Sequence, residues 1–320
     1  MLWVFSLPVL VPAMIYGMLQ LCAWKSVRKA ERSHPPIGKF LYVKGCRVHY
    51  VMEGSGPPLV LVHGAGGNIR DWTFQLLDAL KESYTVIAFD RPGHGYTDPL
   101  HEDGETLAEQ ADLLAAALKL LGHRAAIVLG YSFGGAVALA WALNHPSMVR
   151  ALCLVAAVSN NWVLTTSYLY DWAAAKSTSW FFAPFLAGIV PNTWVSEGYD
   201  EVFSPQKTPH GYLDHVGYAL TVRPKSFRAN SRQIKRLRPQ ILRMVEQYEK
   251  ITMPVEIIHG TLDRSVPIKI HSDILIDQIP HAVYRRLDKF GHGLHQLAIP
   301  TIVDSLERLK SNCTLNGTCL

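Results

Sequence analysis

Short apolar runs alternate with amphipathic stretches along most of the chain. The runs end in polar or glycine-rich residues, which is typical of buried strands. They lie at residues 59–63, 85–89, 125–129, 151–158, 255–259 and 282–287. The stretches with helical spacing lie at residues 72–80, 106–121, 136–144, 268–279 and 298–309. This alternation predicts an α/β fold with a mostly parallel, doubly wound sheet that helices cover on both faces.

The same pattern predicts how the chain is divided. A hairpin around Lys44 and Gly45 opens the folded body, and a long segment without strands interrupts it. The predicted divisions are a membrane anchor at 1–24, a basic and proline-containing linker at 25–39, a first core segment at 40–158, a helical cap with its return segment at 159–252, a second core segment at 253–310 and a flexible tail at 311–320.

The segment at 159–252 is too long for a simple connection between two strands. It is rich in aromatic side chains, and its spacing favours short helices. We expect a cap over the carboxyl ends of the strands; the alternative is a second small core that only packs on the sheet. Eight basic residues between Arg223 and Arg243 have no acidic residue among them. We expect a solvated face there, with contact to anionic lipid headgroups as the alternative.

The first 24 residues contain no charged side chain. About 20 apolar residues are enough for a helix to cross a bilayer, and Pro8 and Pro12 are tolerated in such helices. Basic residues follow directly, from Lys25 to Arg32. Because the positive charge follows the apolar stretch, we expect an uncleaved single-pass anchor rather than a signal peptide.

The basic flank of this anchor also predicts the orientation of the protein. Lysine and arginine next to a membrane span favour the cytoplasmic side, so we expect the folded body there. Two glycosylation-type sequons in the tail, at Asn312 and Asn316, favour the opposite side. The cytoplasmic prediction therefore depends on the charge of the flank alone.

Charge and cysteine content exclude several classes of function. The net charge is +5, which is too small to indicate nucleic-acid binding, and no nucleic-acid motif is present. The five cysteines form no Cys-x-x-Cys pair and predict no zinc site. We expect reduced thiols, although Cys313 and Cys319 are close enough in sequence to form a bridge in an oxidising compartment. No metal-ligand or dinucleotide motif appears, so we expect no cofactor.

The strand at 125–129 leads into Gly130-Tyr131-Ser132-Phe133-Gly134 and then into a helix. A serine in a sharp G-x-S-x-G turn between strand and helix can present its hydroxyl above the sheet. A serine hydroxyl needs a base, and the base needs an acid to orient it. Asp263 follows the strand at 255–259, and His292 lies between two glycines after the last strand.

The chain resembles the α/β-hydrolase fold superfamily, in its branch of esterases, lipases and C–C hydrolases with a helical cap. The motifs that carry the resemblance are 63–67 (His-Gly-Ala-Gly-Gly), 90–95 (Asp-Arg-Pro-Gly-His-Gly), the serine turn, 260–263 (Gly-Thr-Leu-Asp) and 291–292 (Gly-His). The order Ser, Asp, His is that of the family. The resemblance implies Ser132 as nucleophile, His292 as general base and acid, and Asp263 as orienting carboxylate.

The resemblance also implies an oxyanion hole of backbone N–H groups from Phe133 and Ala65, with Gly66 as the alternative to Ala65. We expect His63, Tyr131, Trp162 and Trp172 to line the substrate pocket. His63 and His94 lie near the predicted pocket, but for both we favour a role in bracing loops through hydrogen bonds. His295 is a competing candidate for the base, but its surroundings lack the two glycines that flank His292.

These features predict a serine hydrolase that cleaves a carboxylic ester with a small or lipid-derived acyl group. Its partners are that substrate and the membrane; the sequence does not determine the oligomeric state. Epoxide hydrolases of this fold use an elbow aspartate, which Ser132 replaces here. The alternatives are a C–C bond hydrolase or a thioesterase with the same three residues, or a ligand-binding protein without turnover.

Overall fold

The computed structural model describes residues 7–162, 168–189 and 192–315 of the chain. Within these residues, eight strands form one sheet in the order β1-β2-β4-β3-β5-β6-β7-β8. The strands are β1 (Lys39–Val43), β2 (Cys46–Glu53), β3 (Pro58–Val62), β4 (Thr85–Phe89), β5 (Ala126–Tyr131), β6 (Val149–Val155), β7 (Val255–Gly260) and β8 (Val283–Leu287). Strands β1 and β2 are antiparallel to their neighbours, and all other pairs are parallel. The predicted doubly wound, mostly parallel sheet is confirmed.

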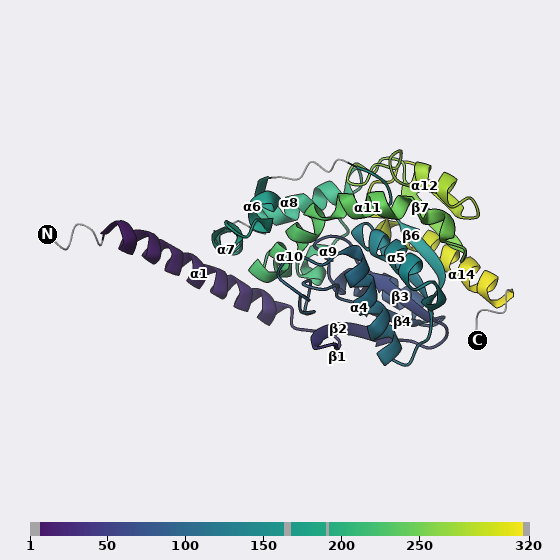
Figure 1. Cartoon of the computed structure of the whole chain (residues 1–320), viewed down its shortest axis with the longest axis horizontal. Helices are drawn as coiled ribbons and strands as arrows, with labels where there is room; N and C mark the ends of the chain where they lie inside the picture. Colours follow the sequence, from purple (N-terminus) through teal and green to yellow (C-terminus); the bar gives the residue numbers. More distant parts are fainter. Residues whose placement is uncertain (1–6, 163–167, 190–191, 316–320) are drawn as a thin grey trace.

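Helices cover both faces of this sheet (Figure 1). The helices of the body are α2 (Arg70–Thr73), α3 (Leu76–Leu80), α4 (Leu107–Leu120), α5 (Phe133–Asn144), α12 (Ser272–Gln278), α13 (Leu294–Leu297) and α14 (Ile299–Leu315). The helix predicted at 72–80 is therefore split into α2 and α3. The backbone leaves the helical conformation at Gln75 (φ −148°). The neighbouring Phe74 ring packs against rings of Tyr212 and His215.

The alternation of side chains along β3 explains why the strand is apolar throughout. Val60 and Val62 pack on one face with α4, α5 and α12, whereas Leu59 and Leu61 pack on the other face with α3 and α14. All four side chains are buried. A strand covered on both faces loses the alternation of polar and apolar residues that a half-exposed strand shows.

Within the described residues, the inserted segment between β6 and β7 consists of helices joined by turns and irregular stretches, and it contains no strand. Its helices are α6 (Tyr168–Ala174), α7 (Ser179–Ile189), α8 (Asn192–Phe203), α9 (Tyr212–Val216), α10 (Pro224–Lys235) and α11 (Leu237–Val245). They lie beside the body at one edge of the sheet (Figure 1). The end of the segment belongs to the core, because Leu237 and Ile241 of α11 pack with α4 and α5 on the sheet.

The basic run in this segment is only in part the solvated face that the sequence predicts. Four of its side chains are exposed, and the other four are buried or half-buried: exposed are Lys225, Lys235, Arg238 and Arg243, whereas Arg223, Arg228, Arg232 and Arg236 are covered. Arg232 Nη1 binds the Glu102 side chain at 3.1 Å, and Lys225 Nζ lies 2.7 Å from Asp98 Oδ1. Arg236 Nη1 donates to the Gly104 carbonyl oxygen at 2.6 Å. These partners lie in the loop between β4 and α4, so the basic side chains fasten the cap to the body. The acidic partners lie more than 100 residues away in the sequence. The basic run alone therefore could not indicate that its side chains attach the cap to the body.

Helix α1 (Leu7–Ser33) extends nine residues beyond the predicted end of the anchor, through the first residues of the expected linker. It projects from the body (Figure 1). Its exposed side chains include Leu10, Met14, Met18 and Trp24, each more than half exposed. Among the described residues it is the one helix that is long and apolar enough to cross a membrane. At the other end, α14 runs through residues expected to be a flexible tail.

Arg223 connects α1, the cap and the body. Its Nη1 donates to Glu31 Oε1 of α1 at 2.9 Å, its Nη2 donates to the Gly95 carbonyl oxygen, and its guanidinium lies over the Tyr96 ring. The Arg223 side chain is buried. Its removal leaves a partly buried carbonyl group and a partly buried carboxylate without their donor.

We expect Arg223→Ala to lower the Tm by about 5 °C, which corresponds to a loss of about 2 kcal/mol in a protein of this size. The control is Lys176→Ala, which removes an exposed ion pair with Asp103. Exposed pairs of this kind contribute about 0–1 kcal/mol, so its Tm should stay close to that of the wild type. Thermal unfolding in detergent measures both. Equal Tm values for the two variants would contradict this account of Arg223.

Candidate active site

Ser132 lies in a strained turn between β5 and α5. Its backbone has φ +56° and ψ −120°, a conformation that residues other than glycine rarely adopt. The turn is held by hydrogen bonds from Ser132 N to Val155 O (3.0 Å) and from Val158 N to Ser132 O (3.1 Å). It also needs glycines. A Cβ at Gly134 would lie 2.1 Å from Val62 O, and one at Gly130 would lie 2.5 Å from Gly134 O.

Three side chains from distant segments meet above this turn. The Ser132 hydroxyl lies 2.9 Å from His292 Nε2, and His292 Nδ1 lies 2.7 Å from Asp263 Oδ2. These distances fit a hydroxyl that donates to Nε2 and an Nδ1–H that donates to the carboxylate. His295, the competing candidate for the base, contacts Tyr212 instead of Ser132.

Asp263 is held by more than His292. Its Oδ1 accepts a hydrogen bond from Val266 N at 2.7 Å, and its Oδ2 lies 3.1 Å from His259 Nε2. Burial by itself would raise the pKa of Asp263, but the charge and hydrogen bonds of His292 and the hydrogen bond of His259 outweigh it and hold the pKa well below its ordinary value. The carboxylate is therefore ionised at neutral pH and orients His292. His259 is a supporting residue that sequence analysis missed, although it lies at the end of the strand that leads to Asp263.

The predicted oxyanion donors line the same cavity as the Ser132 hydroxyl. No hydrogen bond from the N–H of Phe133 or of Ala65 is found among the described residues. The Gly66 N–H already donates to Asn230 Oδ1 at 2.9 Å. Of the two alternatives, Ala65 is therefore the one whose N–H is available to a ligand.

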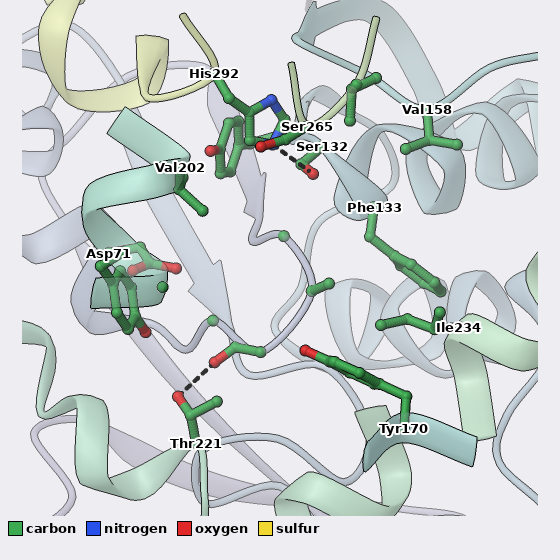
Figure 2. Close-up of a pocket in the computed structure, with 18 of the residues that line it drawn as sticks. Asp71, Ser132, Phe133, Val158, Tyr170, Val202, Thr221, Ile234, Ser265 and His292 are labelled. Carbon is green, nitrogen blue, oxygen red and sulfur yellow. Dashed lines mark hydrogen bonds between the residues drawn. The ribbon is translucent and has the colours of Figure 1, made fainter. Parts of the chain in front are cut away.

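A cavity of about 590 Å³ opens beside Ser132 and His292 (Figure 2). The cap and the body both contribute to its lining, which is largely apolar. Its walls include Val158, Leu186, Val202, Phe227, Ile234 and Leu237. A volume of this size accommodates a small molecule or a short acyl chain.

Two of the four side chains expected to line the pocket do so. Tyr131 and Trp162 line the cavity, but His63 and Trp172 do not. His63 is fully buried in the loop: its Nδ1 donates to Gly64 O at 2.9 Å, and its Nε2 accepts from Arg91 N at 3.0 Å. Burial and the nearby Arg91 lower its pKa well below the ordinary value, so it stays neutral and braces the loop. Trp172 is half exposed because its helix turns it outward, against Phe182.

His94 and Asp90 also serve the loops rather than the cavity. His94 Nδ1 donates to Pro92 O at 3.0 Å, and burial together with Arg91 lowers its pKa to about 3. Asp90 accepts hydrogen bonds from Ile69 N and Tyr96 N, both at 2.8 Å. These residues shape the strand ends on which the site is built.

A second polar cluster on the cavity wall was not predicted. Asp71 Oδ1 accepts a hydrogen bond from the Tyr212 hydroxyl at 2.9 Å, and that hydroxyl lies 3.1 Å from His295 Nε2. All three residues line the cavity and are buried. Burial raises the pKa of Asp71 to about 7, while it lowers the pKa of His295 to about 3. The glycine-rich loop at 63–67 indicated the region, but nothing in the sequence pointed to Tyr212, which lies 141 residues from Asp71.

Cys313 and Cys319 are the two cysteines that the sequence places close enough to form a bridge. Cys313 is buried, and its Sγ lies 3.5 Å from Arg150 O. Cys319, its possible partner, lies outside the described residues. Among the described residues, no cluster of histidine, cysteine, aspartate and glutamate could hold a metal ion.

Comparison with known proteins shows that the chain belongs to the alpha/beta hydrolase fold family. The family model for the alpha/beta hydrolase fold matches residues 57–297. A 2-hydroxymuconate semialdehyde hydrolase from Pseudomonas putida is 27% identical over 82% of this chain and 90% of its own length. A pimeloyl-acyl-carrier-protein methyl ester esterase from Vibrio atlanticus is 33% identical over 71% of this chain and 84% of its own.

Other matches are partial or structural. An acetyltransferase component of an acetoin cleaving system from Cupriavidus necator is 39% identical over 43% of this chain, which spans only 37% of that protein. The crystal structure of a membrane phospholipase A, a bacterial virulence factor, matches with a TM-score of 0.65 at 20% identity. The match covers 96% of this chain and 98% of the other, so the shared fold extends into α1.

The raised pKa of Asp71 predicts a pH-dependent stability. An unfolded aspartate ionises near its ordinary pKa of about 4, whereas the folded one keeps its proton until about pH 7. Proton binding by Asp71 therefore stabilises the folded protein. This contribution to the free energy of unfolding is complete below pH 4 and is lost as the pH rises to 7, by roughly 1 kcal/mol per pH unit. Asp71→Asn cannot ionise and keeps an acceptor for Tyr212. The other charged groups near Asp71, Asp90 and Arg91, are the same in both proteins.

We therefore expect the Tm of Asp71→Asn to rise relative to that of the wild type between pH 5 and pH 8, by about 5 °C or more. Thermal unfolding of both proteins across this range tests it. A constant difference in Tm would show that Asp71 is ionised throughout.

Proposed function

Because the chain belongs to the alpha/beta hydrolase fold family, we propose that it is a serine hydrolase that cleaves carboxylic esters with a small or lipid-derived acyl group. The observation that supports this most directly is the hydrogen-bonded series Ser132, His292 and Asp263 at the wall of a largely apolar cavity. Available N–H groups of Phe133 and Ala65 lie at the same wall.

In the proposed first step, Ser132 Oγ attacks the ester carbonyl carbon while its proton moves to His292 Nε2. The carbonyl π bond opens, and its oxygen takes the negative charge. The N–H groups of Phe133 and Ala65 stabilise that oxyanion; one such donor typically contributes about 10²–10³ in rate. The carbon–oxygen bond to the alcohol then breaks, and His292 gives its proton to the departing alcohol.

In the second step, a water molecule gives a proton to His292 Nε2 and attacks the acyl-serine carbonyl carbon. The bond to Ser132 Oγ breaks, His292 returns the proton to Oγ, and the free acid leaves. Asp263 stays ionised and stabilises the imidazolium in both steps, which its lowered pKa permits.

The second candidate is hydrolysis of a carbon–carbon bond. The similarity to the 2-hydroxymuconate semialdehyde hydrolase, over 82% of this chain, favours it. The same three residues could also serve a thioesterase. Esters, thioesters and vinylogous diketones that share one acyl group distinguish these activities by their relative kcat/KM.

We further propose that α1 anchors the protein in a membrane. Seven large apolar side chains of α1 are exposed between Leu10 and Trp24. A helix of a water-soluble core would bury such a surface. The basic residues from Lys25 to Arg32 favour the cytoplasmic side for the body, against the two sequons at Asn312 and Asn316. The membrane phospholipase A that shares the fold into α1 is in keeping with this.

The packing of α7 on α1 then brings some of the cap into the bilayer. The Trp180 ring of α7 lies 5.0 Å from the Tyr16 ring, and Gly188 approaches Cys22 and Ala23 closely. Tyr16 is nine residues before Lys25, which corresponds to about 14 Å along the helix axis, or half of a hydrocarbon layer of about 30 Å. Helix α7 has no charged residue, and Trp180, Phe181 and Ile189 are exposed. A lipid-derived substrate could thus reach the cavity, which Leu186 of α7 lines, from the membrane.

A fluorophosphonate probe tests the catalytic assignment. We expect the purified, folded protein to be modified at Ser132 and to hydrolyse short-chain esters, and Ser132→Ala to lose both properties. Asp263→Asn should lower kcat by about 10⁴, because it leaves His292 in the wrong tautomer. Intact Ser132 after treatment of the folded protein would refute the assignment, and binding of ligand without hydrolysis of any ester would favour a non-catalytic role.

The depth of α7 is testable with a fluorophore in reconstituted vesicles. In a Cys22→Ser background, an environment-sensitive dye on Phe181→Cys should show blue-shifted emission and quenching by spin-labelled lipids. The control is Lys119→Cys, which lies exposed on α4 and should be quenched by aqueous iodide instead. Quenching of both dyes by iodide alone would place α7 outside the bilayer.

A further inference from the structure

The proposed catalytic steps use only one side of the cavity. Figure 2 shows Ser132 and His292 near one end, with Phe133, Val158 and Ile234 on one side and Asp71 and Thr221 on the other. The side of Phe133 and Ile234 is apolar apart from the Tyr170 hydroxyl, and it suits an acyl chain. The side of Asp71 carries a carboxyl group that the proposed reaction does not require.

The structure keeps room for this carboxyl group. Asp71 is 4% exposed, and it lines the cavity. A Cβ at residue 67 would lie 2.3 Å from Asp71 Oδ2, so only glycine at that position leaves the carboxyl where it is. Gln296 donates to the Asp71 backbone oxygen and helps to hold the residue in place.

The hydrogen bonds around Asp71 have one consistent arrangement. The Tyr212 hydroxyl donates its only proton to Asp71 Oδ1, so it accepts a proton from His295 Nε2–H. Neutral His295 fits this role, because its buried Nδ1 has no hydrogen-bond partner among the described residues. The Tyr131 ring stacks on His295 at 4.0 Å and fixes the position of the imidazole.

Asp71 lacks the partners that normally compensate a buried carboxylate. It forms no ion pair with any described residue, and no described side chain donates to Oδ2. The backbone N–H of Asn68 lies close enough to lower its pKa, but burial has the larger effect and raises the pKa to about 7. Such a group accepts a hydrogen bond as the carboxylate and donates one as the acid. A hydroxyl group of a ligand matches both forms.

We propose that Asp71, positioned by Tyr212 and His295, forms a subsite that binds a free hydroxyl group on the alcohol portion of the ester. The preferred substrates are then esters of an apolar acid with a polyol, such as monoacylglycerols. This inference rests on the proposed ester hydrolysis. The alcohol portion is assigned to this side because the acyl chain fits the apolar wall opposite.

Three butyrate esters with one common acyl group test the subsite: glycerol monobutyrate, n-propyl butyrate and butyrylcholine. We expect the wild type to show a kcat/KM at least tenfold higher for the glycerol ester than for the propyl ester. Asp71→Leu should lower the value for the glycerol ester about tenfold or more, since a buried site that loses its hydrogen-bonding group no longer favours a hydroxyl. The value for the propyl ester should stay within about twofold.

Two further variants keep the result interpretable. Asp71→Asn retains a partner for Tyr212, so it replaces Asp71→Leu if that variant does not fold, and it should lose some of the preference. Ile234→Ala, on the opposite wall, should change the three esters alike. Equal effects of Asp71→Leu on all three esters would overturn the proposal. So would a preference for butyrylcholine that depends on Asp71, because it would show a cation site.

Failure of the inference can be told apart from failure of the proposed function. A wild-type protein that hydrolyses none of the esters and leaves the fluorophosphonate unreacted contradicts the proposed function. A protein that reacts with the probe and hydrolyses the glycerol and propyl esters equally well contradicts only the hydroxyl subsite.

Discussion

The backbone of Ser132 is the constraint on which the rest of the site depends. A non-glycine residue at φ +56° costs on the order of 1–3 kcal/mol and persists only where its surroundings enforce it. Here the enforcement comes from hydrogen bonds to Val155 and Val158 and from the absence of side chains at Gly130 and Gly134. The same turn sets the Ser132 hydroxyl within reach of His292 and begins α5 at Phe133, which lines the cavity. One local geometry thus aligns the proposed nucleophile with its proposed base and oxyanion donor.

The cavity exists only because the cap is held against this turn. Arg232 of α10 donates to the carbonyl and carboxylate oxygens of Glu102 in the body, and Asn230 of the same helix accepts from Gly66 N at 2.9 Å. Arg223 extends this attachment to Glu31 of α1. Helix α1, the cap and the loop that supplies a proposed oxyanion donor are therefore joined in one connected structure.

Sequence analysis was most successful for features that depend on residues close together in the sequence. The apolar runs predicted the strands, and their ends indicated Ser132, Asp263 and His292, because parallel strands bring their carboxyl ends to one edge of the sheet. It failed where the partner lies far away in sequence. His63 was a candidate for the pocket wall, but its hydrogen bond with Arg91 gives it the loop-bracing role that the sequence analysis favoured. Trp172 was expected there too, but the rotation of α6 turns it outward. The partners of Asp71 and of the basic run come from segments more than 100 residues away, which no local pattern specifies.

The two carboxyl groups of the site show how neighbours assign roles to identical side chains. Both Asp71 and Asp263 are buried, and burial acts on each in the same direction. Asp263 faces two histidines, whose hydrogen bonds favour the ionised form, so it serves as a permanent negative charge behind His292. Asp71 accepts a hydrogen bond from a tyrosine and forms no ion pair with any described residue, so burial disfavours its charged form and it remains a group for hydrogen bonding. The site therefore holds one charged carboxylate beside the proposed base and one readily neutralised carboxyl on the wall of the cavity. This is the division that an ester with an apolar acid and a hydroxylated alcohol would require.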